Sequence, residues 1–236
     1  MLLKGKNAVV YGGAGSIGGA AARAFAREGA HVFLAGRTPA PLQALAKEIG
    51  AEWAVVDALD AAAVDAHADT IGRIDISFNV INHNDVQGTP MAEMDVEDYL
   101  APVLTAVRTN LITWQAAARH GAGVILVFGG EGDPPRGYHL GGLQTAFHAL
   151  EAMRRQFSTE NRGVRVITLR TGGVPESIPK NFQGRDAITK SLDESTLLGR
   201  SATLEDVGNV AAFVASDQAR TMTAATVNVS AGALID

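Results

Sequence analysis

The stretch that decides the fold is Tyr11-Gly12-Gly13-Ala14-Gly15-Ser16-Ile17-Gly18, which follows a short apolar run and leads into an alanine-rich segment. Because glycine has no Cβ, Gly12 can turn the chain sharply, and Gly18 lets a following helix approach the preceding strand. Amide groups at the start of such a helix bind phosphate groups. A glycine-rich run of this kind can also be a simple turn with no ligand. Its place after a first buried strand favours a site for a dinucleotide pyrophosphate.

Short apolar runs alternate with longer helical patterns along the chain, an order typical of parallel sheets built from βαβ units. The expected strands are residues 8–11, 31–35, 52–56, 74–80, 123–128, 164–169 and 226–229. They do not alternate with polar residues, as is typical of strands buried on both faces. The expected helices are residues 18–29, 39–49, 95–120, 141–161 and 203–216. The fold class is therefore α/β: a single doubly wound Rossmann domain over residues 1–236, with a seven-stranded parallel sheet and helices on both faces.

Two local patterns refine this expectation near the end of the chain. Residues 174–200 are polar and contain glycine, so we expect an irregular substrate loop or lid there. Thr203 followed by Asp206 predicts a capping arrangement at the start of the last helix, because each side chain can bond to the other residue's backbone amide.

The composition argues against several classes of function. A net charge of −5 argues against a nucleic-acid partner, since nucleic acids bind basic surfaces. The chain has no cysteine, which rules out disulfides and cysteine nucleophiles. Its six histidines show no metal-ligand spacing, so no metal is expected. No apolar run approaches ~18 residues, and the N-terminus lacks a signal-peptide pattern. We expect a cytoplasmic protein without a membrane segment.

The end of the second expected strand, Ala35-Gly36-Arg37-Thr38, indicates which cofactor binds. An acidic side chain there would hydrogen-bond a ribose 2′-hydroxyl and repel a 2′-phosphate. Gly36 stands where that acid is expected. Arg37 can bind a phosphate in a bidentate manner and Thr38 can add a hydroxyl, although Arg37 can also be a solvated turn residue. The pattern favours NADP(H) over NAD(H).

These motifs resemble those of the short-chain dehydrogenase/reductase family. The glycine loop resembles T-G-x-x-x-G-I-G, with Tyr11 in place of threonine and Ser16 in place of the middle glycine. Residues 198–232 resemble the family's L-G-R…P-E-D-I/V…F-L-A-S-D…V-D-G-G ending, with Ser230 and Ala231 as departures. The resemblance covers essentially the whole chain.

The resemblance implies a set of cofactor contacts. Asp57, at the end of the third expected strand, would meet the adenine. Asn79 is the one match to the family's N-N-A-G segment, and it is as able to brace the backbone as to touch a ligand. The full set is Gly12, Gly15, Ser16, Ile17, Gly18, Arg37, Thr38, Asp57 and Asn79.

The catalytic residues that the resemblance implies have no counterpart in this chain. The family uses a serine, a tyrosine, a lysine four residues after it and an asparagine on the preceding helix. Two anchors, the glycine pair at 129–130 and the helical pattern at 152–160, agree on the register. They place the serine, tyrosine and lysine positions at Gly130, Leu143 and Phe147. The asparagine position, which the anchors do not fix, is assigned to Ala106. Leu143 and Phe147 also belong to an apolar helical stripe, so we expect packing residues there.

Polar side chains in loops after the expected strands could still reach a pocket, because ligands bind at the carboxyl ends of such strands. The candidates for an acid or base are Tyr138, His139 and Glu131; further polar residues of these loops are His83, Asn84, Asp85, Asp133, Arg170 and Thr171. Taken one by one, each is more readily explained as a surface or loop-fixing residue.

Two functions stay open. The first is an atypical NADP(H)-dependent oxidoreductase that acts on a small carbonyl or alcohol substrate with rearranged acid/base groups. The second is an NADP(H)-binding homologue without ordinary redox activity, such as a sensor, a structural paralogue or a repurposed lyase or isomerase. The expected partners are a small-molecule substrate and further copies of the chain, in a homodimer or homotetramer.

Overall fold

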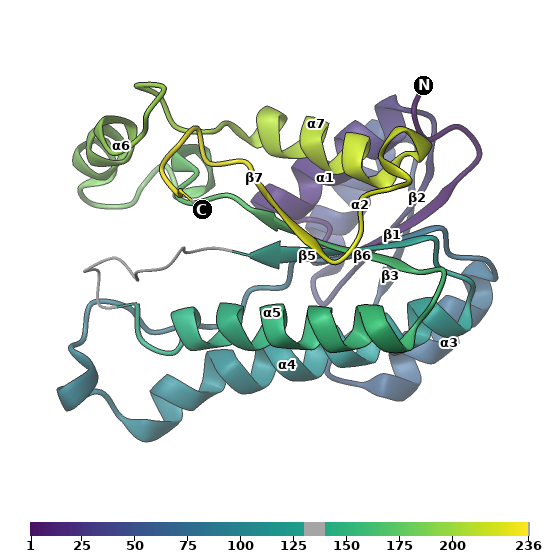
Figure 1. Cartoon of the computed structure of the whole chain (residues 1–236), viewed down its shortest axis with the longest axis horizontal. Helices are drawn as coiled ribbons and strands as arrows, with labels where there is room; N and C mark the ends of the chain where they lie inside the picture. The colour runs from purple at the N-terminus through teal and green to yellow at the C-terminus, as the bar shows by residue number, and fades with distance from the viewer. Residues whose placement is uncertain (130–139, 236) are drawn as a thin grey trace.

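The computed structural model describes residues 1–129 and 140–235. Within them a seven-stranded sheet has the order β3-β2-β1-β4-β5-β6-β7, and all neighbouring strands run parallel (Figure 1). This confirms the predicted α/β Rossmann fold. The strands are β1 (Asn7–Tyr11), β2 (His31–Gly36), β3 (Glu52–Val55), β4 (Ile76–Asn79), β5 (Val124–Gly129), β6 (Arg165–Arg170) and β7 (Ala225–Asn228).

Helices cover both faces of the sheet (Figure 1). Side chains of α1, α2 and α7 pack into the core on one face, and those of α3, α4 and α5 pack into the core on the other. The helices are α1 (Ser16–Arg27), α2 (Pro39–Ile49), α3 (Ala61–Ile71), α4 (Val96–Arg119), α5 (Leu143–Glu160), α6 (Arg185–Glu194) and α7 (Leu204–Ala215). Short 3-10 turns occupy Met91–Glu93, Pro175–Ser177 and Asp217–Ala219.

The central strand β1 shows why its sequence is apolar without alternation. Ala8 and Val10 point into the core shared with α1 and α7, whereas Val9 points into the core shared with α3, α4 and α5. All three are fully buried. Because successive strand residues point to opposite faces, a strand covered by helices on both faces needs apolar residues at every position.

The sequence-based expectation was wrong in two places. Residues 174–200 are not wholly irregular, because they contain α6, and α3 was not predicted at all. Both helices lack a wide apolar stripe: α6 buries no side chain, and α3 buries only Val64 and Ala68. Asp60 begins α3 by accepting hydrogen bonds from the amides of Ala62 and Ala63. The capping arrangement predicted for Thr203 and Asp206 is confirmed at the start of α7.

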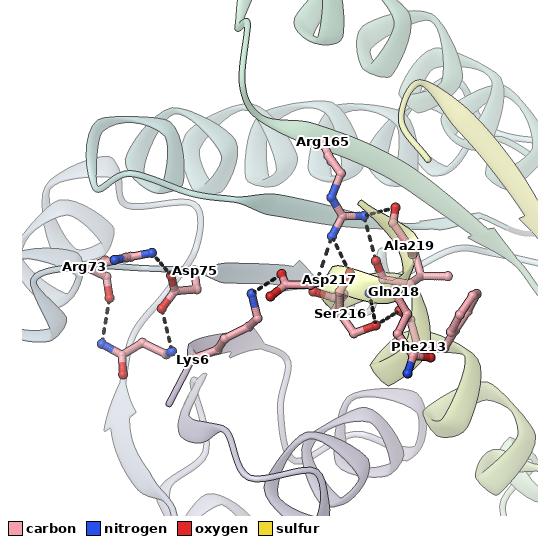
Figure 2. A network of polar contacts seen from close by, with 12 residues as sticks. Lys6, Arg73, Asp75, Arg165, Phe213, Ser216, Asp217, Gln218 and Ala219 are labelled. Atoms are coloured by element: carbon pink, nitrogen blue, oxygen red, sulfur yellow. Dashed lines mark hydrogen bonds and ion pairs between the residues drawn. The ribbon is translucent and has the colours of Figure 1, made fainter. Parts of the chain in front are cut away.

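A polar network at the amino ends of the strands, opposite the end that carries the glycine loop, ties β6 to the end of α7 (Figure 2). The guanidinium of Arg165, at the start of β6, donates to backbone carbonyls at the end of α7 and in the turn that follows it. The last carbonyls of a helix have no partner within the helix. Nearby, the Lys6 ammonium lies 2.7 Å from the Asp217 carboxylate, a contact that holds the pKa of Asp217 below its usual value. The carbonyl acceptors of Arg165 belong to Val214, Ala215, Ser216, Ala219 and Met222.

We expect Arg165→Met to lower the free energy of unfolding by about 2 kcal/mol, because the carbonyls lose a charged, half-buried donor. For a chain of this size the melting temperature should fall by roughly 4–8 °C. Thermal and urea unfolding measure the change. The exposed Arg162, a few residues away, provides the matched control Arg162→Met, which should leave stability unchanged. Equal stability of the two variants would contradict the role given to Arg165.

Candidate functional site

A cleft of about 780 Å³ opens at the carboxyl ends of the strands. Its walls come from the loops after β1, β2, β3 and β4 and from α4, α5 and the end of β5. The volume lies within the range of small-molecule and cofactor sites. β1 lies between β2 and β4 in the sheet, so the chain order reverses at the cleft, which is where ligands bind in open parallel sheets. A shallower depression of about 440 Å³ is lined by residues of α6 and by Gly199.

The glycine loop fits so closely against its neighbours that Gly12 and Gly18 have no room for a side chain. Gly12 has a φ of +76°, and a Cβ on it would lie 2.6 Å from the carbonyl oxygen of Val80. A Cβ on Gly18 would lie 2.4 Å from the carbonyl oxygen of Gly12. Real Cβ atoms do not approach carbonyl oxygens this closely. Gly18 therefore lies buried beneath the loop, and Gly12 lines the cleft.

The N-terminus of α1 points its free amides at the cleft. Gly15 is the N-cap residue, no side chain caps the helix, and its first turn carries no acidic residue. Gly15, Ser16 and Ile17 all line the cleft. The first amides of a helix have no intrahelical acceptor and carry partial positive charge. The glycine loop and these amides fit the pyrophosphate of a dinucleotide.

A second helix N-terminus, that of α2, lies at the adenosine end of the cleft. Gly36, Arg37 and Thr38 line the cleft there. Thr38 is the N-cap of α2, yet its hydroxyl caps no amide, and the first turn of α2 has no acidic residue. Arg37 is exposed and makes no hydrogen bond or ion pair with the described residues. The Arg37 guanidinium and the Thr38 hydroxyl are therefore available to bind a ligand.

Asp57 and Asn79, the other two predicted cofactor contacts, have different positions. Asp57 is exposed and lines the cleft, and its carboxylate accepts a hydrogen bond from the amide of Leu59. Asn79 is buried behind the cleft wall. Its amide group donates to the Thr113 hydroxyl at 3.3 Å, and its side-chain oxygen accepts from the amide of Ile81 at 3.2 Å. Asn79 thus braces the chain that leaves β4.

The inner end of the cleft is largely apolar. Leu143 and Phe147 line it from α5, and Phe128 lines it from β5. The rings of Phe128 and Phe147 lie edge to face with centroids 6.2 Å apart. Ala106 is fully buried in α4, and Thr105 and Thr109 of the same helix line the cleft. These two threonines and Phe128 were missed by sequence reasoning; Thr105 and Thr109, four residues apart, share one helix face.

His83 is the buried titratable group at this end. It lines the cleft after β4, with 7% of its surface exposed, and its ring lies 6.0 Å from the ring of Phe147. Burial lowers the pKa of His83 below its usual value, and the negative charge of Asp85 opposes the shift. His83 was expected only as one of several polar loop residues. The predicted acid/base candidates, Glu131, Tyr138 and His139, lie outside the described residues, as does Gly130.

Two further findings concern what the described residues lack. Within residues 1–129 and 140–235, no three histidine, aspartate or glutamate side chains come together in a way that could hold a metal ion. None of the helices in this part of the chain is both long and apolar enough to cross a membrane.

Comparisons with known proteins agree on one family. Residues 12–233 match the family model described as Enoyl-(Acyl carrier protein) reductase. The chain is 30% identical to "Oxidoreductase asL5" of Sarocladium schorii, over 98% of this chain and 96% of that protein. A solved structure described as a short chain dehydrogenase/reductase family protein is 26% identical, with a TM-score of 0.85 over 98% of both chains.

The structure of BdcA in complex with NADPH has the same fold, with a TM-score of 0.86 at 24% identity over 100% of this chain and 98% of that one. The glycine loop at the switch point of a parallel sheet, the match over nearly the whole chain and the likeness of the relatives lead to one conclusion. The chain belongs to the short-chain dehydrogenase/reductase family of NAD(P)-dependent oxidoreductases.

Proposed function

We propose that the protein is an NADP(H)-dependent oxidoreductase that acts on a small carbonyl or alcohol substrate with rearranged acid/base groups. The observation that carries the cofactor choice is the run Gly36-Arg37-Thr38 at the adenosine end of the cleft. A guanidinium without a partner among the described residues, a free hydroxyl and a helix N-terminus converge there. Each of them attracts a phosphate group.

The absence of an acid at Gly36 supports the same choice. The nearest atoms to a Cβ on Gly36 would belong to the Leu42 side chain, at 3.6 Å, which is an ordinary contact. The position therefore has room for a Cβ, and packing around that atom does not require glycine. An acid there would repel a 2′-phosphate. Glycine leaves the space to the phosphate and to Arg37.

We expect Arg37→Ala to weaken NADPH binding by roughly 10- to 100-fold and to leave NADH binding unchanged, because a charged hydrogen bond to the 2′-phosphate is lost. Gly36→Asp should weaken NADPH binding and strengthen NADH binding. Titration of both cofactors by fluorescence measures the affinities. The exposed Arg108 on α4 supplies the control Arg108→Ala. Equal affinity of the wild type for NADPH and NADH would refute the cofactor assignment.

The rearranged chemistry rests on the sequence register that assigns Leu143 and Phe147 to the tyrosine and lysine positions. Their side chains line the inner cleft and offer no proton donor. General acid catalysis contributes about 10²–10⁴-fold to such reactions. The same observation favours the second candidate function, an NADP(H)-binding homologue without ordinary redox activity.

We expect the wild type to reduce ordinary carbonyl compounds weakly or not at all. The double substitution Leu143→Tyr with Phe147→Lys should not restore activity, because it places two polar groups in a packed apolar stripe. NADPH oxidation against ketones, aldehydes and quinones measures turnover. Robust wild-type turnover that Tyr138→Phe abolishes would show that Tyr138 is the acid. Tight NADP(H) binding with no turnover on any carbonyl would favour the non-redox function.

We also propose that the protein forms a homodimer or homotetramer. α4 carries an exposed apolar stripe, Val96, Leu100, Leu104 and Leu111. Exposed stripes of this kind on a helix mark association surfaces.

Light scattering at micromolar concentration should give two or four times the chain mass of 24.6 kDa. Leu104→Glu should shift the protein towards the monomer, because association would bury the new charge. Val55→Glu, on the exposed edge strand β3, serves as the control and should leave the mass unchanged. A wild-type mass of a single chain would rule out the proposed association.

A further inference from the structure

His83 has an unusual combination of burial, position and unused hydrogen-bonding capacity. It is 7% exposed and lines the inner cleft. Neither ring nitrogen makes a hydrogen bond with any described residue. Neither nitrogen is among the fully buried side-chain atoms without a partner, so both are open to the cleft. The imidazole is therefore available to a ligand in the cleft.

The chain on either side of His83 holds it in this position. The amide of Val80 donates to the carbonyl oxygen of Tyr11 and extends the contact between β4 and β1. The side-chain oxygen of Asn82 accepts a hydrogen bond from the amide of Asn84 at 2.7 Å, and Asn84 has a φ of +55°. Asparagine tolerates this left-handed conformation better than other residues with a side chain. The turn thus fixes the backbone of His83.

The surroundings of His83 favour a flat apolar ligand. Its ring packs at 60° to the ring of Phe147, which in turn packs edge to face against Phe128. Leu143 extends the apolar wall. Aromatic rings attract other rings in edge-to-face and offset arrangements. A planar group that enters the inner cleft would contact these side chains while its polar atom reaches the imidazole.

The structure assigns to His83 the role of exchanging a proton with the oxygen of a flat, apolar carbonyl compound or its alcohol, an aryl ketone being the simplest example. This inference rests on the proposed function and names both the acid/base group and the substrate class. It does not require a residue at the positions of Leu143 or Phe147 to carry a proton.

The proton and the electrons balance in both directions. The nicotinamide cofactor, when bound, takes or gives the hydride. In oxidation, the hydroxyl of the alcohol loses its proton to a ring nitrogen of His83 while the carbon loses the hydride. The products are a carbonyl compound and an imidazolium, which releases its proton to water. In reduction, the imidazolium returns the proton to the oxygen.

The charges around His83 set the direction of its pH dependence. Burial lowers the pKa, and Asp85 opposes this. The cleft side chains from α4, α5 and β5 at this end are Thr105, Thr109, Leu143, Phe147 and Phe128, none of which titrates near neutral pH. A pKa below 6.5 leaves the imidazole neutral at pH 7. Alcohol oxidation, which needs the base, should therefore be supported at pH 7, and carbonyl reduction should rise as the pH falls through the pKa.

The first experiment measures binding of 2-acetylnaphthalene to the protein saturated with NADP⁺, a mixture in which no reaction takes place. By calorimetry we expect His83→Leu to weaken ketone binding by about 5-fold, the value of one hydrogen bond. His83→Asn keeps a donor and should retain most of the affinity. The matched control is His67→Asn: His67 packs against Tyr11, and burial lowers its pKa too, but it does not line the cleft.

The second experiment measures the slow reduction of 2-acetylnaphthalene between pH 5 and 8, at a protein concentration high enough to follow weak turnover. The wild type should be faster at lower pH, and His83→Asn should lose this dependence although it still binds the ketone. Tyr138→Phe and His139→Asn should keep it. The assignment is overturned if His83→Leu binds the ketone as tightly as the wild type does. It is also overturned if the pH dependence survives in His83→Asn or disappears in Tyr138→Phe or His139→Asn.

Cofactor binding separates this inference from the function on which it rests. Each His83 variant should bind NADP⁺ as tightly as the wild type, which also shows that it is folded. Failure of the wild type to bind NADP⁺ would overturn the proposed function. Normal NADP⁺ binding with unchanged ketone binding in His83→Leu would overturn only the role of His83.

Discussion

The architecture of the cleft depends on the close contact between the glycine loop and the chain that leaves β4. Gly12 has a positive φ, and with no Cβ it leaves room for the Val80 carbonyl, while Gly18 rests directly on Gly12. A side chain at either position would push α1 away from the sheet or β4 away from β1. The contact therefore fixes two things together: the direction of the free amides of α1 and the place where the chain carrying His83 enters the cleft.

Much of the fold could be predicted because its dominant feature is local in sequence. Strands buried on both faces need continuous apolar runs, and these are visible without knowledge of their neighbours. α3 and α6 could not be predicted in the same way, because they bury two residues and none, respectively. What starts α3 is the side chain of Asp60, a signal that is shared by many turns and so is weak on its own.

The residues of the site also differ in how far sequence alone could identify them. The position of Arg37 follows from its place at the end of β2, so sequence order was enough to select it. The importance of His83 depends instead on Phe147, which is far away in the sequence and reaches the same cleft only because β4 and β5 are neighbours. Among several polar loop residues, nothing in the sequence distinguished it. Asn79 is the opposite case, because a motif match selected it as a cofactor contact. In the structure its side chain bonds to Thr113 and to the backbone amide of Ile81.

The lack of buried side chains in α6 has a consequence for how the sequence of this protein can evolve. Substitutions in a segment that contributes nothing to the core cost little stability, usually less than about 0.5 kcal/mol each. Ser177, in the 3-10 turn that precedes α6, is already part of the cleft wall. Val174 and Pro175 beside it are buried and so are constrained, but α6 itself can vary in sequence while the sheet and the glycine loop stay fixed. Close packing constrains the glycine loop, whereas α6 can diverge at little cost in stability.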